Sequence, residues 1–270
     1  MKISFIGGGN MADALIGGLL RRGFAAADLR VVEILPEARH RLKDKYGVAC
    51  FDHAHGAIRD DDIVLLAVKP QQMREALKSL GVAPDSHLVI SIAAGMRLTT
   101  LSQWSGSTRL VRAMPNTPAL IGEAVTGLYP MSDAVTAQDR KDAETILGAV
   151  GKTVWIEHES QMDAVTAVSG SGPAYVFYFI EAVEEAAREL GLPAAVAHRL
   201  ALETFTGAAR LAASSADPVS ALRERVTSKG GTTERALASM AKDRVKDAIV
   251  RAIRAANERG RELGDELGRD

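Results

Sequence analysis

The chain has 270 residues, of which 47% are hydrophobic and 25% are charged, and its formal net charge at pH 7 is −1. This composition is typical of an ordinary globular protein and excludes an intrinsically disordered one, and the length is sufficient for two domains. The balanced charge gives no electrostatic reason to expect a nucleic-acid or membrane-surface partner.

The sequence also restricts the possible sites and compartment. Cys50 is the only cysteine, which excludes an internal disulfide and a cysteine-based metal site. No apolar run reaches the roughly 18 residues that suggest a membrane span, and no signal-peptide core follows Met1 and Lys2. We therefore expect a cytoplasmic protein without a membrane partner. The histidines show no metal-like spacing, so no metal is predicted (His40, His53, His55, His87, His158 and His198).

Strand-like and helix-like segments alternate through residues 1–158. Apolar strands separated by helices indicate a mostly parallel sheet covered on both faces. The predicted strands are 2–6, 29–34, 62–68, 87–93, 108–114, 123–130 and 153–156, and the predicted helices are 10–22, 36–46, 71–80 and about 136–149.

The pattern changes after Trp155. From about residue 161 the strand signals vanish, and residues 159–270 are predicted to form a separate helical domain. One helix should begin near Pro173 and end by Gly191. Its segment AYVFYFI is apolar on every side, which favours packing against a second subunit; a central core helix of a monomer is the alternative.

The segment FIGGGNMA matches a dinucleotide-binding loop. Gly7, Gly9 and Ala12 satisfy G-x-G-x-x-A between a predicted strand and a predicted helix. The first glycine permits a tight turn, the second lets a pyrophosphate approach the backbone, and Ala12 allows close packing. Glu33, near the end of the second strand, would hydrogen-bond a ribose 2′-hydroxyl and repel a 2′-phosphate, which favours NADH. A plain structural turn and a solvated glutamate are the alternatives.

Three further segments follow strand ends, where open α/β sheets bind ligands. AVKPQQ contains Lys69 and Pro70, SIAAG ends at Gly95, and RAMPNTPA places Asn116 and Thr117 between two prolines. RAMPNTPA could instead be only a rigid connector.

Two segments of the helical region also differ from ordinary helix sequence. SGSGPAY and VTSKGGTTERAL lead into helices with small and hydroxylated residues. A helix start of this kind offers N–H donors and a favourable dipole to a carboxylate. Ordinary N-capping is the alternative for either segment alone.

Together these segments resemble the Δ1-pyrroline-5-carboxylate reductases, which make L-proline in the last step of its biosynthesis. FIGGGNMA, AVKPQ, SIAAG, RAMPNTPA, VSGSGPAY and VTSKGGTTERAL occur in the family's order, from Ile3 to about Ile253. The resemblance implies an α/β Rossmann-type N-terminal domain with a parallel-rich sheet, followed by an all-α C-terminal dimerisation domain. It further implies a homodimer, often assembled into rings such as a pentamer of dimers.

The resemblance also implies roles for individual residues. The substrate carboxylate would be held by a loop of the neighbouring subunit (Ser228, Gly230, Gly231 and Thr232). Thr233, the predicted catalytic residue, would hydrogen-bond the ring nitrogen. NADH or NADPH would bind along Ile6, Gly7, Gly9, Asn10, Met11, Glu33, Val68, Lys69, Pro70, Ala93, Met114 and Asn116.

The implied chemistry needs neither a nucleophile nor a metal. The substrate is a small cyclic imine with one carboxylate, and nicotinamide delivers a hydride to its electrophilic carbon. Threonine is a poor acid, so Thr233 is interpreted as orienting the ring, with the proton coming from solvent or already on the imine.

One departure from the family concerns the cofactor. Many relatives carry residues suited to a 2′-phosphate after the second strand, whereas Glu33, Ile34 and Leu35 offer no side-chain donor here. The family often prefers NADPH, but this sequence favours NADH, unless Arg30 or Arg39 reaches a phosphate. Glu33→Ser is predicted to improve NADPH use relative to NADH.

Two rival functions are weaker. A β-hydroxyacid dehydrogenase would carry a lysine on the first long helix of the helical domain, and SGSGPAYVFYF has none. A non-catalytic dinucleotide-binding regulator would have no need of the SKGGTT loop.

Overall fold

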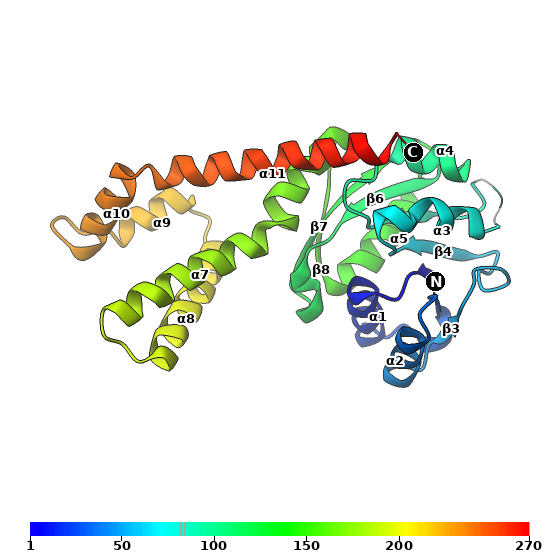
Figure 1. The fold of residues 1–270 in the computed structure, drawn as a ribbon, viewed down its shortest axis with the longest axis horizontal. Coiled ribbons are helices and arrows are strands. Elements are labelled where there is room, and N and C mark those ends of the chain that lie inside the picture. Colours follow the sequence, from blue (N-terminus) through cyan, green and yellow to red (C-terminus); the bar gives the residue numbers. More distant parts are fainter. Residues whose placement is uncertain (82, 84, 270) are drawn as a thin grey trace. The chain divides into compact units, whose positions relative to one another are not determined.

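The computed structural model describes residues 1–81, 83 and 85–269, which form two compact units (Figure 1). Unit 1 comprises Met1–Ser171 and Ala256–Asp270, and unit 2 comprises Gly172–Ala255. The sequence-based domain boundary after residue 158 stays a prediction; the division into compact units falls after Ser171, because the segment preceding it packs on the sheet of unit 1.

Unit 1 is built on one eight-stranded sheet in the order β3-β2-β1-β4-β5-β6-β7-β8. The order from β3 to β6 is that of a dinucleotide-binding Rossmann sheet. All neighbouring pairs are parallel except β6 and β7. The strands are β1 (Lys2–Ile6), β2 (Leu29–Val32), β3 (Ala49–Phe51), β4 (Asp62–Leu66), β5 (Val89–Ser91), β6 (Leu110–Met114), β7 (Ala124–Pro130) and β8 (Gly151–Trp155).

Helices cover both faces of this sheet because the side chains of each strand alternate between two apolar clusters. Phe5 and Leu65 join Leu15 of α1 on one face, while Ile6 and Leu66 join the α3 and α4 side on the other. The helices are α1 (Asn10–Arg21), α2 (Pro36–Tyr46), α3 (Met73–Ser79), α4 (Leu98–Ser105), α5 (Ala137–Leu147) and α6 (Met162–Val165).

Short turns complete this unit. They are the 3₁₀ segments η1 (Ala26–Asp28), η2 (Pro70–Gln72), η3 (Thr117–Ile121), η4 (Gly148–Val150) and η5 (Glu159–Gln161), and one π-helical turn, η6 (Thr166–Gly170).

The C-terminal part of α11 (Val245–Leu267) also belongs to unit 1. Figure 1 shows this end of the helix, in red, beside α4. Arg97 forms an ion pair of 2.5 Å with Asp265, and Leu267 packs against the α3–α4 cluster. The absence of a side chain at Gly264 allows this approach, since a Cβ there would lie 3.2 Å from the carbonyl oxygen of Gly95.

Unit 2 consists of α7 (Gly172–Glu189), α8 (Ala194–Ser214), α9 (Val219–Arg225), α10 (Thr232–Lys242) and the first part of α11. Helices α7 and α8 form an antiparallel pair (Figure 1). In the single chain Phe177 is 62% and Tyr178 71% exposed, so α7 is not a central core helix of this unit. This finding removes the monomeric alternative considered for AYVFYFI.

The predicted fold class, a parallel-rich α/β domain followed by a helical region, is confirmed. The sequence prediction omitted strand β3 and helix α4, both of which are short and lack a strong apolar period. Within the described residues, no helix is both long and apolar enough to cross a membrane.

Candidate functional site

The carboxyl ends of the parallel strands gather the predicted cofactor residues of unit 1 along one edge of the sheet. Backbone hydrogen bonds continue the ladder past the strand ends: the Gly7 N–H donates to Val32, the Ala67 N–H to Ile6, and the Ile92 N–H to Leu66. Ligands bind at this edge in open α/β sheets. The residues brought there are Ile6, Gly7, Gly9, Asn10, Met11, Glu33, Val68, Lys69, Pro70, Ala93, Met114 and Asn116.

The three glycines of the loop after β1 differ in how much space each leaves for a side chain. Gly7 has a φ of +102°, and a Cβ there would lie 2.6 Å from the carbonyl oxygen of Ala67, so a side chain is excluded on both counts. A Cβ on Gly8 would lie 2.8 Å from a methyl of Leu42. A Cβ on Gly9 would meet nothing within 4 Å, so the space beside this glycine is open. A phosphate can approach the backbone there.

The amino terminus of α1 is suited to an anion. Gly9 is the N-cap, and no side chain caps the N–H groups of the first turn, which include those of Asn10 and Met11. Asp13 in this turn forms an ion pair of 2.9 Å with Lys45, which offsets its negative charge. The donors, the dipole and the open space at Gly9 together fit a pyrophosphate.

Glu33 is tied to the glycine loop. Its carboxylate accepts the Gly8 N–H at 2.7 Å through Oε2 and the Leu35 N–H at 2.9 Å through Oε1. The side chain therefore connects the end of β2 to the loop after β1. The carboxylate lies where an acidic residue would meet the ribose of a bound dinucleotide.

The two arginines considered as phosphate ligands are engaged with the backbone. Arg30 donates to the Ala57 carbonyl at 2.7 Å, and its guanidinium lies 5.6 Å from the centre of the Phe51 ring. Arg39 donates to the carbonyls of Glu33 and Ile34 at 2.7 and 2.9 Å.

Arg41 is a residue that sequence reasoning missed. It lies on α2 and donates to the Gly8 carbonyl at 3.0 Å, so Glu33 and Arg41 bind the N–H and the carbonyl of the same loop residue, Gly8. Arg41 is an exposed residue in the middle of a charged helix, and the sequence did not single it out because many such arginines contact only solvent.

The ends of β4, β5 and β6 contribute different kinds of surface. Ala93 is buried and Val68 is half-buried, whereas the Lys69 side chain is exposed. Pro70 begins η2. Asn116 is 8% exposed and follows β6 in extended conformation.

Unit 2 brings together the predicted substrate-binding residues where a loop meets α10, whose first two residues are Thr232 and Thr233. Gly231 is the N-cap of α10 and has no side-chain cap, and its N–H donates to the Ser228 carbonyl at 3.0 Å. The Gly230 N–H donates to the Glu234 carboxylate at 2.7 Å. Ser228 and Thr232 are exposed and Thr233 is half-exposed, so their hydroxyls are accessible to a ligand.

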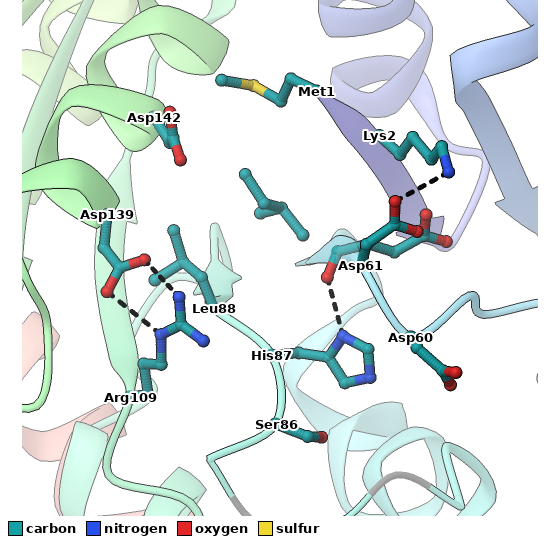
Figure 2. Close-up of a pocket in the computed structure, with 12 residues that line it drawn as sticks. Met1, Lys2, Asp60, Asp61, Ser86, His87, Leu88, Arg109, Asp139 and Asp142 are labelled. Atoms are coloured by element: carbon teal, nitrogen blue, oxygen red, sulfur yellow. Dashed lines mark hydrogen bonds and ion pairs between the residues drawn. The ribbon is translucent and has the colours of Figure 1, made fainter.

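A polar cavity of about 490 Å³ lies at the opposite edge of the sheet, where strands begin (Figure 2). Lys2 pairs with Asp61 at 2.7 Å and Arg109 pairs with Asp139 at 2.6 Å. Both pairs are drawn as dashed lines in Figure 2. The His87 ring is hydrogen-bonded to the Asp62 carbonyl at 2.8 Å. Because this edge carries the amino ends of β1, β4 and β5, the cavity is separate from the dinucleotide edge.

No three His, Cys, Asp or Glu side chains are grouped to hold a metal ion in the part of the chain that the structure describes.

Two family models match the chain. The model for pyrroline-5-carboxylate reductase dimerisation matches residues 159–263, and that for NADP oxidoreductase, coenzyme F420-dependent, matches residues 2–95. The first covers unit 2 and the second covers the glycine loop and Glu33.

Solved structures share the fold over nearly the whole chain. A pyrroline-5-carboxylate reductase from Coxiella burnetii has a TM-score of 0.89 at 37% identity, covering 97% of this chain and 98% of that one. The pyrroline carboxylate reductase of Plasmodium falciparum, solved with NADP bound, has a TM-score of 0.86 at 30% identity and covers 98% of both chains.

Sequence relatives agree with this similarity. The pyrroline-5-carboxylate reductase of Pseudomonas aeruginosa is 42% identical over 269 residues, covering 99% of this chain and 98% of that protein. The Arabidopsis thaliana enzyme is 34% identical over 264 residues, covering 97% and 95%. The family predicted from the sequence motifs is thereby confirmed: the chain belongs to the pyrroline-5-carboxylate reductases.

Proposed function

We infer that this chain is a reductase that converts L-Δ1-pyrroline-5-carboxylate to L-proline by hydride transfer from a nicotinamide dinucleotide, in the last step of proline biosynthesis. The observation that carries this inference is the glycine loop at the ligand edge of a Rossmann sheet, in a chain 42% identical to the Pseudomonas aeruginosa enzyme over nearly its full length. The cytoplasm remains the predicted location.

The protein's contribution to this reaction is binding and orientation. When bound, the cofactor supplies the hydride. The uncapped first turn of α1 and the open space at Gly9 hold its pyrophosphate, and Ala93, Met114 and Asn116 line the end of the sheet near the nicotinamide. The loop of Ser228, Gly230, Gly231 and Thr232 binds the substrate carboxylate through its hydroxyls and the uncapped N–H groups at the start of α10. The N–H groups of Gly230 and Gly231 already donate to Glu234 and Ser228, so these two glycines shape the loop. The Thr233 hydroxyl orients the ring nitrogen, and the proton comes from solvent or is already on the imine.

The first test is turnover of L-Δ1-pyrroline-5-carboxylate with NADH and with NADPH in parallel, followed by the loss of reduced-nicotinamide absorbance. Turnover with either cofactor is expected. A folded oligomer that binds a cofactor but oxidises neither NADH nor NADPH with this substrate would contradict the reductase function. A non-catalytic dinucleotide-binding regulator would then be the better interpretation.

We propose that NADH is preferred. Glu33 supports this preference because its carboxylate would lie beside a 2′-phosphate, and Arg30 and Arg39 are engaged with backbone carbonyls. Glu33→Ser should raise the ratio of kcat/KM for NADPH to that for NADH by roughly 10-fold, the effect of about 1.4 kcal/mol. Glu33→Gln serves as the matched variant, since it keeps an acceptor for Gly8 but removes the charge. Unchanged selectivity in both variants would contradict the role of Glu33.

We also propose that the enzyme is a homodimer in which the loop before α10 completes the site of the neighbouring subunit. The dimerisation family match and the exposed apolar side chains of α7 support this assembly. Further assembly into a pentamer of dimers stays a prediction.

Mixed dimers test the shared site. Gly9→Val fills the open space beside the pyrophosphate position without a clash, and Thr233→Ala removes the orienting hydroxyl. If each site joins two subunits, a mixture of the two inactive variants should regain about a quarter of wild-type activity, because one site of each hybrid dimer is intact. If each site belongs to one subunit, no activity returns. Gly148→Ala, at another glycine with open space, is the control for substitution of a glycine.

A further inference from the structure

The π-helical turn Thr166–Gly170 precedes a proline in the first turn of α7. The Ser171 N–H donates to the Thr166 carbonyl at 2.8 Å, five residues back instead of the usual four. Pro173 has no N–H, so the Ser169 carbonyl, four residues before it, lacks the donor that an α-helix would normally supply. Proline therefore leaves one carbonyl of this turn in need of a partner.

Asn116 provides that partner. Its Nδ2 donates to the Ser169 carbonyl at 3.1 Å, and its Oδ1 accepts the Val125 N–H at 3.0 Å. The side chain is 8% exposed and stands between Pro115 and Pro118, which restrict the backbone around it. One carboxamide thus joins the end of β6, the start of β7 and the π-helical turn.

Two more side chains of β6 contact the same segment. Arg112, Met114 and Asn116 are every second residue along β6 and the extended segment after it, so their side chains lie on one face. Arg112 pairs with Glu159 at 3.2 Å and with Asp163 at 3.3 Å. The Met114 methyl lies beside Gly170, where a Cβ would be 2.6 Å from it. We call these three residues the β6 row. Together they contact the segment 159–170 near both of its ends.

We propose that Asn116 is a positioning residue for hydride transfer, acting through its bond to the Ser169 carbonyl. The proposal rests on the proposed function, in which the nicotinamide lies at the carboxyl ends of β5 and β6. Hydride transfer is sensitive to small displacements of the groups that hold the two reactants. The bond from Asn116 to Ser169 keeps residues 114–116 in place against the segment 159–170, which Arg112 anchors at its other end through Glu159 and Asp163.

The decisive experiment uses Asn116→Asp with and without Pro173→Ala in the full-length enzyme. Asn116→Asp keeps an acceptor for the Val125 N–H but loses the donor to Ser169. Pro173→Ala restores an N–H that can reach the Ser169 carbonyl along the helix. Each variant is assayed for kcat, for KM of the imine, for the isotope effect with NADH deuterated at the transferred position, and for melting temperature.

For Asn116→Asp we expect kcat to fall about 10-fold or more. The imine KM should stay within about twofold, because the carboxylate-binding loop is unchanged. The isotope effect should rise as hydride transfer becomes limiting, and adding Pro173→Ala should restore most of kcat. Asn257→Asp makes the same chemical change on α11 and should leave all four quantities unchanged. Asn116→Ser, which cannot reach Ser169 and adds no charge, replaces Asn116→Asp if that variant does not fold.

A purely structural role would lower the melting temperature while kcat per folded site and the isotope effect stay at wild-type values, and this result would overturn the proposal. A loss of kcat that Pro173→Ala does not restore would overturn it as well. Failure of the wild-type enzyme to turn over the imine would instead overturn the proposed function, and the proposal with it.

Discussion

The two compact units bury their apolar side chains in different ways. Leu65 in β4 is fully buried within unit 1, whereas Phe177 in α7 is 62% exposed on unit 2. Among residues 172–255, all of which the structure describes, only Ala197 and Ala201 are buried. Burying a large apolar side chain contributes about 1.5–3 kcal/mol, so unit 2 has little of this stabilisation within one chain. Unit 1 is built around its own core, while unit 2 leaves exposed the apolar side chains that the proposed dimer would cover.

The largest expected effect comes from a charge on the exposed face of unit 2. Phe177→Asp should raise the dimer dissociation constant by roughly 100-fold or more, because an unpaired carboxylate would be buried in each half of the interface. Analytical ultracentrifugation over a range of concentrations measures this change. Val154→Asp places the same charge on an equally apolar, 51% exposed position of unit 1 and should leave the assembly unchanged. A Phe177→Asp protein that stays fully dimeric would show that α7 is not at the interface.

A core truncation in unit 1 should have the next largest effect. Leu65→Ala leaves a cavity in a fully buried position and should lower the free energy of unfolding by about 3 kcal/mol. Urea denaturation measures it. Leu190→Ala, at a position 84% exposed in unit 2, is the matched control and should change the free energy by less than about 0.5 kcal/mol. A loss at Leu190 comparable to that at Leu65 would mean that another subunit covers this position too.

Acid should weaken unit 1 through Asp139. Burial by itself would raise the pKa of this carboxyl, but hydrogen bonds from Arg109 and Thr136 outweigh burial and lower the pKa below its usual value. A lowered folded-state pKa contributes stability that is present above the unfolded value of about 3.9 and is lost as the pH falls through the folded one.

Asp139→Asn removes this charge and weakens the capping box of α5. At pH 7 the variant should lose about 2 kcal/mol of unfolding free energy, a value discounted for the partial exposure of Arg109. Its stability should also vary less with pH below about 4. Urea midpoints of both proteins between neutral and acidic pH measure this. Parallel pH profiles for wild type and variant would contradict the role of Asp139.

The smallest effect is expected at Arg259, whose ion pairs with Glu262 and Glu266, both 2.8 Å, lie on the exposed surface of α11. Solvent and salt screen such pairs. Arg259→Ala should leave the melting temperature unchanged within error, and a clear decrease would show that this part of α11 is covered in the assembly.

The sequence by itself determined the fold class, the dinucleotide loop and the family, because these depend on local signals: apolar period, glycine spacing and motif order. Gly7 illustrates this, since the tight turn that the motif predicts at this glycine is found with a positive φ. The sequence singled out Glu33 as a ribose ligand, which stays a prediction, but did not indicate its bond to Gly8.

Only the tertiary structure decided how distant motifs meet. RAMPNTPA and VSGSGPAY were each prominent in the sequence, but nothing local shows that Asn116 donates to the Ser169 carbonyl. Strand β3 and helix α4 were omitted for a related reason, since short elements are stabilised mainly by contacts with neighbours that are distant in sequence. Arg41 likewise acquires its role only where α2 packs beside the glycine loop. Contacts between distant residues arise from packing, and packing has no periodic signature in the sequence.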